Sequence, residues 1–237
     1  MQRLLKDLNL CPVSLGFSCH TKVYIEELLQ TRMIRQPFDW IGCPMWSICE
    51  LLKNDFKDFT EPKKLKPMKR FLGDHKDYLT HLDYNIVFVH DYGNQFHHIP
   101  AALHTKVSED YQRRIQRWNE LLESKTHILF FRLETDGRKR IQRPQFERQG
   151  TELDYLKEFS KILQAKNIKF SIVYLSTSSP RSYDSEHHII TIQYATVSPD
   201  YIVGGDEIKS IVQTDIGFIA KYLFDESKAY NSLPETQ

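Results

Sequence analysis

Unbroken apolar runs and helical repeats alternate along the second half of the chain. Residues 127–133 (HILFFRL) and 170–175 (FSIVYL) are continuous apolar runs of strand length, and residues 152–166 between them carry Leu and Phe at helical spacing. Strands that are apolar at every position are buried on both faces, and a strand–helix–strand unit joins parallel strands by a right-handed crossover. The pattern predicts an α/β fold, a three-layer sandwich with a mostly parallel sheet.

The rest of the chain gives shorter and less regular signals. Residues 13–15 form a short apolar strand that runs into Gly16, and residues 84–89 form a second strand of the buried type. Residues 57–76 are rich in Lys and Pro, which predicts a long, mobile surface loop. The remaining predicted elements are helices at 20–31, 45–54, 108–124 and 206–224 and a strand at 188–193.

Length and composition predict a single α/β domain over residues 1–237. Thirty-two Lys and Arg balance 31 Asp and Glu, so no global field would draw the protein onto nucleic acid or a membrane, and neither is expected as a partner. The first residues lack the apolar core of a signal peptide, and four cysteines do not form a disulfide framework. We therefore expect the cytoplasm, of a cell or of an infected host; the oligomeric state is left open.

Residues that could take part in catalysis or ligand binding follow four predicted strands. Ligands of open parallel sheets bind at the carboxyl ends of the strands, so these residues should meet in one site if the four ends are neighbours. They are Gly16, Ser18, Cys19 and His20 after the first strand, His90 and Asp91 after the second, Arg132 and Glu134 at the third, and Ser176, Thr177 and Ser178 after the fourth.

Cys19 is the candidate nucleophile because it lies at or next to the start of a helix. Unpaired backbone N–H groups and the helix dipole favour a thiolate there, and Gly16 permits a tight strand-to-helix turn. His90 or His20 could take the proton of the thiol. The alternative is that Cys19 is a small residue that packs the turn, as we expect for Cys11, Cys43 and Cys49.

Several other side chains have two interpretations. Asp39 either orients a histidine or caps the helix that begins beyond Gly42. The basic group at one predicted helix, together with Arg132, either grips a phosphate or carboxylate or belongs to a solvated face; the group is Lys106, Arg113, Arg114 and Arg117. The doublets 97–98 and 187–188 lack a third metal ligand, so neither a metal nor another cofactor is expected.

Six segments in order carry a family resemblance. They are SLGFSC (14–19), PFDWIG (37–42), LLKNDFKDF (51–59), VHDY (89–92), YQRRIQRW (111–118) and ILFFRLE (128–134). Together they resemble a family of bacterial and large-virus proteins described as papain-like cysteine peptidases. The resemblance implies Cys19 as nucleophile, His90 as base, and Asp91 or Asp39 as the orienting carboxylate. Many members have Asn where this chain has Ser18.

The predicted parallel sheet differs from the papain architecture, in which the histidine lies on an antiparallel barrel. A strand, a Gly-x-x-Cys turn and a helix look closer to the SGNH-hydrolase or Rossmann-like arrangement. They also resemble thiol-containing acyltransferase-like proteins encoded with polysaccharide synthesis. This comparison concerns the fold alone.

We expect an enzyme with a cysteine nucleophile, a hydrolase or a transferase, that acts on a small-molecule, glycan or peptide substrate. A glycan-biosynthesis transferase that binds a nucleotide-sugar or phosphorylated ligand is the first alternative. A non-catalytic binding module with exposed Trp40 and Trp46 is the second. The residues expected to contact substrate are Gly16, Ser18, His20, Trp40, Arg114, Arg117, Arg132 and Glu134.

Overall fold

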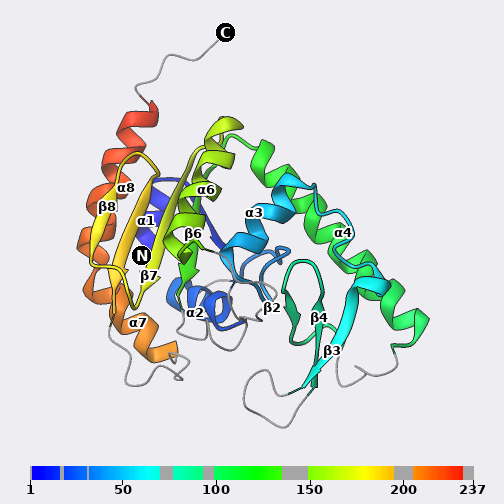
Figure 1. The fold of residues 1–237 in the computed structure, drawn as a ribbon. Helices are drawn as coiled ribbons and strands as arrows, with labels where there is room; N and C mark the ends of the chain where they lie inside the picture. The colour runs from blue at the N-terminus through cyan, green and yellow to red at the C-terminus, as the bar shows by residue number, and fades with distance from the viewer. Residues whose placement is uncertain are drawn as a thin grey trace.

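The fold is given by a computed structural model (Figure 1). Its helices, strands and connections alternate in the α/β manner, with two separate sheets and helices packed around them. The structure describes residues 2–16, 19–30, 32–69, 77–92, 99–134, 149–194 and 205–231.

The larger sheet has five strands in the order β1-β6-β7-β9-β8. The first four strands in this order pair in parallel with one another, and β8 is antiparallel to β9. The predicted mostly parallel sheet is therefore confirmed. Its strands are β1 (Leu10–Ser14), β6 (His127–Leu133), β7 (Phe170–Ser176), β9 (Ile189–Gln193) and β8 (Ser182–Asp184).

Side chains of the central strands alternate between two hydrophobic cores, because successive residues of a strand point to opposite faces. On β6, Phe130 belongs to one core and Phe131 to the other, and both side chains are buried. The first core packs α3 (Met45–Lys53), α6 (Glu152–Ala165) and part of α4 (Ala101–Glu123). The second packs α1 (Gln2–Asp7), α2 (Cys19–Leu29), α7 (Gly205–Thr214) and α8 (Ile216–Asn231).

A second, four-stranded antiparallel sheet was not predicted. Its order is β2-β5-β4-β3, and the strands are β2 (Ile41–Gly42), β5 (Val87–Phe88), β4 (Asp77–His81) and β3 (Leu65–Lys69). Two of these strands are only two residues long, which is too short to give a periodic signal.

Two predictions fail in this sheet. The loop expected over residues 57–76 is wrong at the 3-10 helix η1 (Pro62–Lys64) and at β3, while residues 70–76 lie outside the described residues. Exposed Lys66 and Pro67 resemble a loop in sequence but fit a strand at the edge of a sheet. The strand expected over residues 84–89 is only β5, and it belongs to this sheet rather than the parallel one.

Element boundaries elsewhere differ modestly from the predictions. Helix α6 begins where expected, at a capping box in which Thr151 and Asp154 bond each other's backbone N–H groups. Helix α4 begins at Ala101, earlier than predicted, and the single closing helix is two helices, α7 and α8. Neither α1 nor β8 was predicted. No helix in the described part of the chain is long and apolar enough to cross a bilayer.

Arg132 links the two sheets at the end of β6. Its side chain is fully buried and pairs with Glu152 at the start of α6. Its Nη1 donates to the carbonyl of Leu15 at 2.7 Å, and its Nη2 donates to the carbonyl of Cys43 at 2.9 Å. Leu15 follows β1 and Cys43 follows β2, so one guanidinium connects the backbone that leaves each sheet.

Candidate functional site

Helix α2 begins at Cys19, close to the carboxyl end of β1, as expected. Gly16 makes the turn with a φ of 69°, and a Cβ at this position would lie 2.5 Å from the carbonyl oxygen of Phe38. The hydroxyl of Thr21 donates to the Gly16 carbonyl at 2.9 Å. In Figure 1, α2 lies on the side of the molecule toward which the arrows of β6 and β7 point. Ser18 and the side chains of Cys19 and His20 lie outside the described residues.

Lys22 and Asp39 form a buried ion pair one helical turn after Cys19. The Nζ of Lys22 lies 2.6 Å from Oδ2 of Asp39, and the backbone N–H of Gln36 donates to the same oxygen at 2.6 Å. The two side chains are 2% and 0% exposed. Burial raises the pKa of Asp39, and the ammonium of Lys22 opposes that change. The segment PFDW is thereby attached to the helix of Cys19.

Neither role predicted for Asp39 is seen among the described contacts. Helix α3 begins at Met45 with Pro44 as its N-cap residue, so Asp39 does not cap it. The described hydrogen bonds of Asp39 go to Lys22 and to the backbone of Gln36, and none joins it to a described imidazole. The carboxylate acts instead as the counter-ion of a buried lysine.

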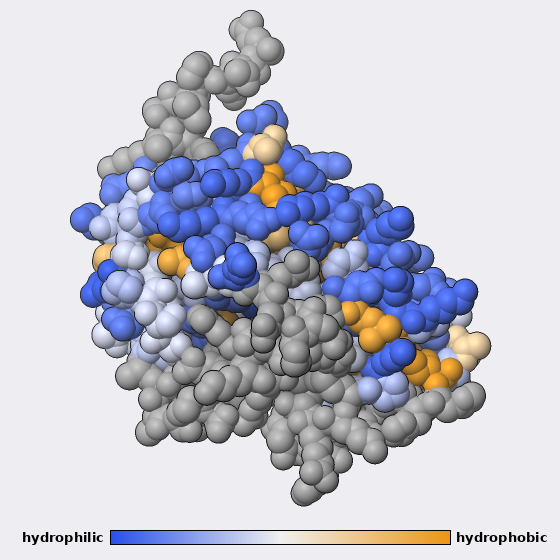
Figure 2. All heavy atoms as spheres, in the orientation of Figure 1, coloured by the Kyte–Doolittle hydropathy of each residue, from blue (hydrophilic) through white to orange (hydrophobic). Residues whose placement is uncertain are grey.

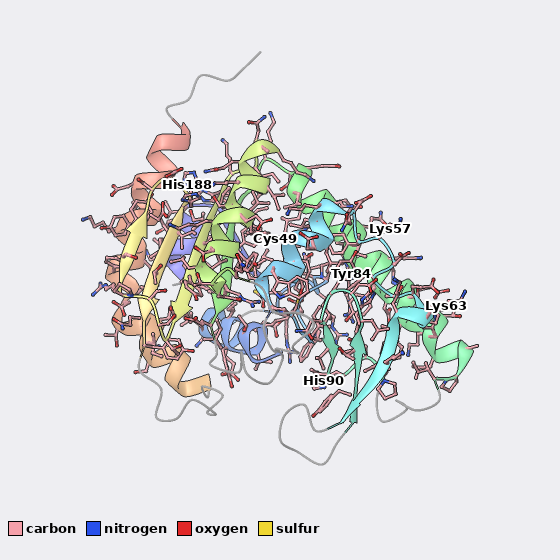
Figure 3. The ribbon with its side chains drawn as sticks, viewed as in Figure 1. Cys49, Lys57, Lys63, Tyr84, His90 and His188 are labelled. Atoms are coloured by element: carbon pink, nitrogen blue, oxygen red, sulfur yellow. The ribbon has the colours of Figure 1, made fainter. Side chains whose placement is uncertain are left out.

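His90 packs against the indole of Trp40. The two ring centroids are 5.5 Å apart and the ring planes meet at 88°. His90 is exposed and Trp40 is half-buried, so the imidazole lies at the surface with the indole ring packed against one side of it. Figure 3 places His90 on the side of the molecule where α2 lies in Figure 1. The guanidinium of Arg35 lies 5.9 Å from the centroid of the same indole.

The expectation that four neighbouring strand ends meet is wrong for His90 and Asp91. They follow β5 of the antiparallel sheet, whereas β1, β6 and β7 are neighbours in the parallel sheet. Cys19 and His90 thus follow strands of different sheets. The described contact that leads from His90 toward α2 is with Trp40, which lies between α2 and β2 in the chain.

Asp91 is held by α4. The hydroxyl of Tyr111 donates to one carboxylate oxygen at 2.7 Å, and Nη2 of Arg114 donates to the other at 3.1 Å. The Arg114 guanidinium also lies 4.5 Å from the centre of the Tyr111 ring. Burial and the neighbouring carboxylate raise the pKa of Tyr111. With both oxygens engaged, Asp91 anchors the turn that carries His90 and does not contact an imidazole of the described residues.

The predicted meeting of the β6 and β7 ends is observed. Glu134 is 1% exposed and accepts hydrogen bonds from the backbone N–H of Thr177 at 3.1 Å and of Ser178 at 3.3 Å. The hydroxyls of Ser176 and Ser178 also donate to this carboxylate. Glu134 thus holds the turn after β7 closed and presents no unoccupied oxygen to a ligand.

Three arginines of the group predicted to grip an anion, Arg114, Arg117 and Arg132, do not act together. Arg132 is fully buried against Glu152, and Arg114 is buried against Asp91. Arg117 donates to the carbonyl of Arg113 on the surface of α4. The side of the molecule shown in Figure 2 is mostly hydrophilic over α4, which fits the interpretation of a solvated face.

Of the other cysteines, Cys43 and Cys49 are packing residues of the core, and Cys11 is partly packed. Cys43 and Cys49 are buried, and burial raises the pKa of both thiols, as it does for half-buried Cys11. Trp46 is only 7% exposed, so the expectation of an exposed aromatic there is wrong.

The histidine doublets do not assemble a metal site within the described chain. Nδ1 of His187 lies 3.1 Å from each carboxylate oxygen of Asp184, and the doublet at 97–98 lies outside the described residues. No group of three His, Cys, Asp or Glu side chains that could hold a metal is found among the residues that the structure describes.

Sequence reasoning missed Lys22 and the hydrogen bond from Tyr111. Lys22 stands three residues after Cys19, one helical turn along α2, a spacing that could have drawn attention to it. Tyr111 was expected on the apolar face of its helix, where its ring does lie, but its hydroxyl had no partner that the sequence could reveal.

The fold and these contacts define an α/β protein with a cysteine at the start of the helix after its first parallel strand and an imidazole supplied by a second sheet. The family model for putative papain-like cysteine peptidases matches residues 11–178, and the chain belongs to this family. The match contains Cys19, Asp39, Trp40 and His90. No curated protein and no solved structure matches the chain.

Proposed function

We propose that the protein is an acyl-transfer enzyme, a hydrolase or a transferase, in which Cys19 is the nucleophile and His90 the general base. The observation that supports this proposal is the linkage of three motif segments. The helix of Cys19 binds PFDW through Lys22 and Asp39, and Trp40 of PFDW packs against His90. Membership of a family of cysteine peptidases supports the same chemistry.

The start of α2 favours a reactive thiol. Backbone N–H groups in the first turn of a helix have no partner within the helix, and the dipole stabilises negative charge there. A thiolate at such a position forms at lower pH than a free thiol, and an imidazolium nearby lowers its pKa further. The same N–H groups can donate to the oxyanion of a tetrahedral intermediate.

The reaction follows from these groups. The Cys19 thiolate attacks the carbonyl carbon of the substrate, and a C–S bond forms as the carbonyl electrons move to oxygen. Collapse of this intermediate breaks the bond to the leaving oxygen, nitrogen or sulfur, which takes its proton from the His90 imidazolium. Water or an acceptor hydroxyl or amine then attacks the thioester, gives its proton to His90 and releases the thiolate.

The substrate class that we propose is an ester, thioester or amide of a small molecule, glycan or peptide. A transferase that binds a nucleotide-sugar or other phosphorylated ligand has less support, because Arg114 and Arg132 are each paired with a carboxylate inside the protein. Three cysteines described in the structure are free thiols, which fits a reducing compartment. We therefore propose that the protein acts in the cytoplasm.

Acylation by p-nitrophenyl acetate tests this proposal. We expect one acetyl group per chain on Cys19, found by peptide mass spectrometry, and release of p-nitrophenol on continued turnover. Cys19→Ala should abolish both, and His90→Asn should slow acylation. Cys11→Ala, which removes another partly accessible thiol, should leave acylation unchanged.

The proposal would be wrong if Cys19 acylated no faster than a free thiol of a short peptide at the same pH. Equal acetylation of Cys11 and Cys19 would contradict it as well. Circular dichroism of the Cys19→Ala and His90→Asn variants distinguishes a lost reaction from a lost fold.

A further inference from the structure

The ammonium group of Lys22 is buried and is not used by the proposed reaction. Its three N–H bonds have three acceptors: Oδ2 of Asp39 at 2.6 Å, the carbonyl of Met33 at 3.2 Å and the carbonyl of Ile34 at 3.3 Å. A cation in the first turn of a helix opposes the helix dipole, and a buried charge needs a counter-ion. Lys22 therefore depends on Asp39.

Lys22 and Glu26 together attach the segment after α2 back onto this helix. Oε1 of Glu26 accepts from the backbone N–H of Met33 at 2.8 Å and lies 3.9 Å from Nζ of Lys22. Residues 22 and 26 share one face of α2, because residues four apart are neighbours on a helix. This face of the helix that begins at Cys19 thus binds residues 33–39.

The attached segment leads directly to His90. Trp40 follows Asp39 in the chain and packs edge-on against the imidazole. Asp39 also interacts electrostatically with Arg114, which holds Asp91 next to His90. Four buried or nearly buried charges therefore alternate in sign from the helix of Cys19 to the turn of His90. They are Lys22, Asp39, Arg114 and Asp91.

We propose that Lys22 is a positioning residue: through Asp39 and the carbonyls of Met33 and Ile34 it fixes Trp40, and with it His90, relative to Cys19. This inference rests on the proposed function and names a residue that serves the same site. Asp39 has a second role: it neutralises the ammonium of Lys22, which lies one helical turn after Cys19 in α2.

Two variants separate position from charge. Lys22→Met/Asp39→Asn removes both charges and the three ammonium hydrogen bonds but keeps an acceptor for the N–H of Gln36. When the imidazole of His90 is less well positioned, it stabilises the Cys19 thiolate less. We therefore expect the pH midpoint of Cys19 alkylation by iodoacetamide to rise and the rate at neutral pH to fall about tenfold. Asp39→Asn alone keeps the hydrogen bonds but removes the nearest counter-ion of the ammonium, so more positive charge acts on the thiolate. We expect its midpoint to fall.

The charged groups nearby, Glu26 and Arg114, are the same in both variants. Neutral replacement of a buried pair often preserves stability, so the double variant is expected to fold, and Lys22→Gln/Asp39→Asn, a second neutral pair, supplies the test if it does not. Lys53→Met, the same substitution at an exposed lysine of α3, serves as the matched control and should not move the midpoint.

Unchanged midpoints in the variants that fold would overturn the role of Lys22 while leaving the proposed function intact. Alkylation of Cys19 in the unaltered protein no faster than a free thiol would instead overturn the proposed function. Opposite shifts in the two variants would support the inference, and a shift of the same sign in both would contradict it.

Discussion

The imidazole of His90 stands perpendicular to the indole of Trp40, with 5.5 Å between the ring centroids. An edge-to-face aromatic pair of this kind contributes about 0.5–1.5 kcal/mol beyond the area that it buries. Because His90 is exposed, this contact is a principal restraint on where its ring points.

Trp40→Ala should therefore weaken the proposed catalytic pair without unfolding the protein. We expect the rate of Cys19 acylation to fall roughly three- to tenfold, the equivalent of the lost aromatic contact. Trp40→Phe, which keeps a ring against the imidazole, should retain most of the rate. An unchanged rate in Trp40→Ala would show that the indole does not restrain His90. Stopped-flow release of p-nitrophenol gives both values.

The four cysteines should differ widely in reactivity. Burial raises the pKa of Cys43 and Cys49, so these thiols should react with iodoacetamide only when the protein unfolds. Cys11 is half-buried with a raised pKa and should react slowly. We expect Cys19 to react first. Peptide mass spectrometry after short labelling times measures the order, and early modification of Cys43 would contradict it.

Two glycines provide a matched pair of stability tests. Gly16→Ala forces an L side chain to a φ of 69° with its Cβ 2.5 Å from the Phe38 carbonyl oxygen, so it should destabilise the fold by at least about 1–2 kcal/mol. Gly217 lies in α8 with no atom within 4 Å of an added Cβ. Gly217→Ala should stabilise by about 0.5–1 kcal/mol. Urea unfolding of both variants checks the opposite signs.

Removal of Arg132 should be among the most damaging single changes. Arg132→Met leaves Glu152 without its partner and the carbonyls of Leu15 and Cys43 without their donor, so we expect a loss of about 3–5 kcal/mol. Arg132→Met/Glu152→Gln should lose less, because no unpaired charge remains. Chemical denaturation measures the difference, and equal losses would show that the carboxylate is not what makes the single variant unstable.

His81 should make stability depend on pH. Its Nδ1 accepts from the N–H groups of Asp83 and Tyr84, and its Nε2 donates to the carbonyl of Asp58 at 2.9 Å, so the neutral ring fits the site. Burial lowers its pKa in the folded state below the ordinary value of 6.5. The unfolded chain then binds more protons below that value, and stability falls as pH decreases from about 6.5.

Thermal unfolding between about pH 7.5 and pH 5.5 tests this dependence. His81→Gln should be less stable at neutral pH but should show a smaller fall on acidification. A slope that is unchanged in His81→Gln would assign the pH dependence to other groups.

The parallel sheet could be predicted because its central strands are buried on both faces and are therefore mostly apolar. Strands β6 and β7 lie between two cores and are buried at all seven positions, and the capping box at Thr151 marks the start of α6. The second sheet could not be predicted, since β2 and β5 are two residues long and β3 carries Lys66 and Pro67 at a sheet edge. Their pairing is decided by tertiary contacts.

The candidate site was predictable in part for the same reason. Cys19 at a helix start and the meeting of Glu134 with the turn after β7 follow from strand ends, a local property. The contacts of Asp39 and Asp91 are long-range, with Lys22 and with Arg114 and Tyr111. A sequence pattern can single out a carboxylate, but it does not identify the distant cation or hydroxyl that the carboxylate contacts in the fold.

Among the described residues, the antiparallel sheet that carries the turn of His90 shares no backbone hydrogen-bond ladder with the parallel sheet that leads to Cys19. Changes in the length of the hairpin formed by β3 and β4 would therefore alter the sheet that leads to His90. The Gly16 turn, which is in close contact with the Phe38 carbonyl, would stay in place. Within one lineage, substrate preference could diversify through insertions in this smaller sheet without rebuilding the nucleophile.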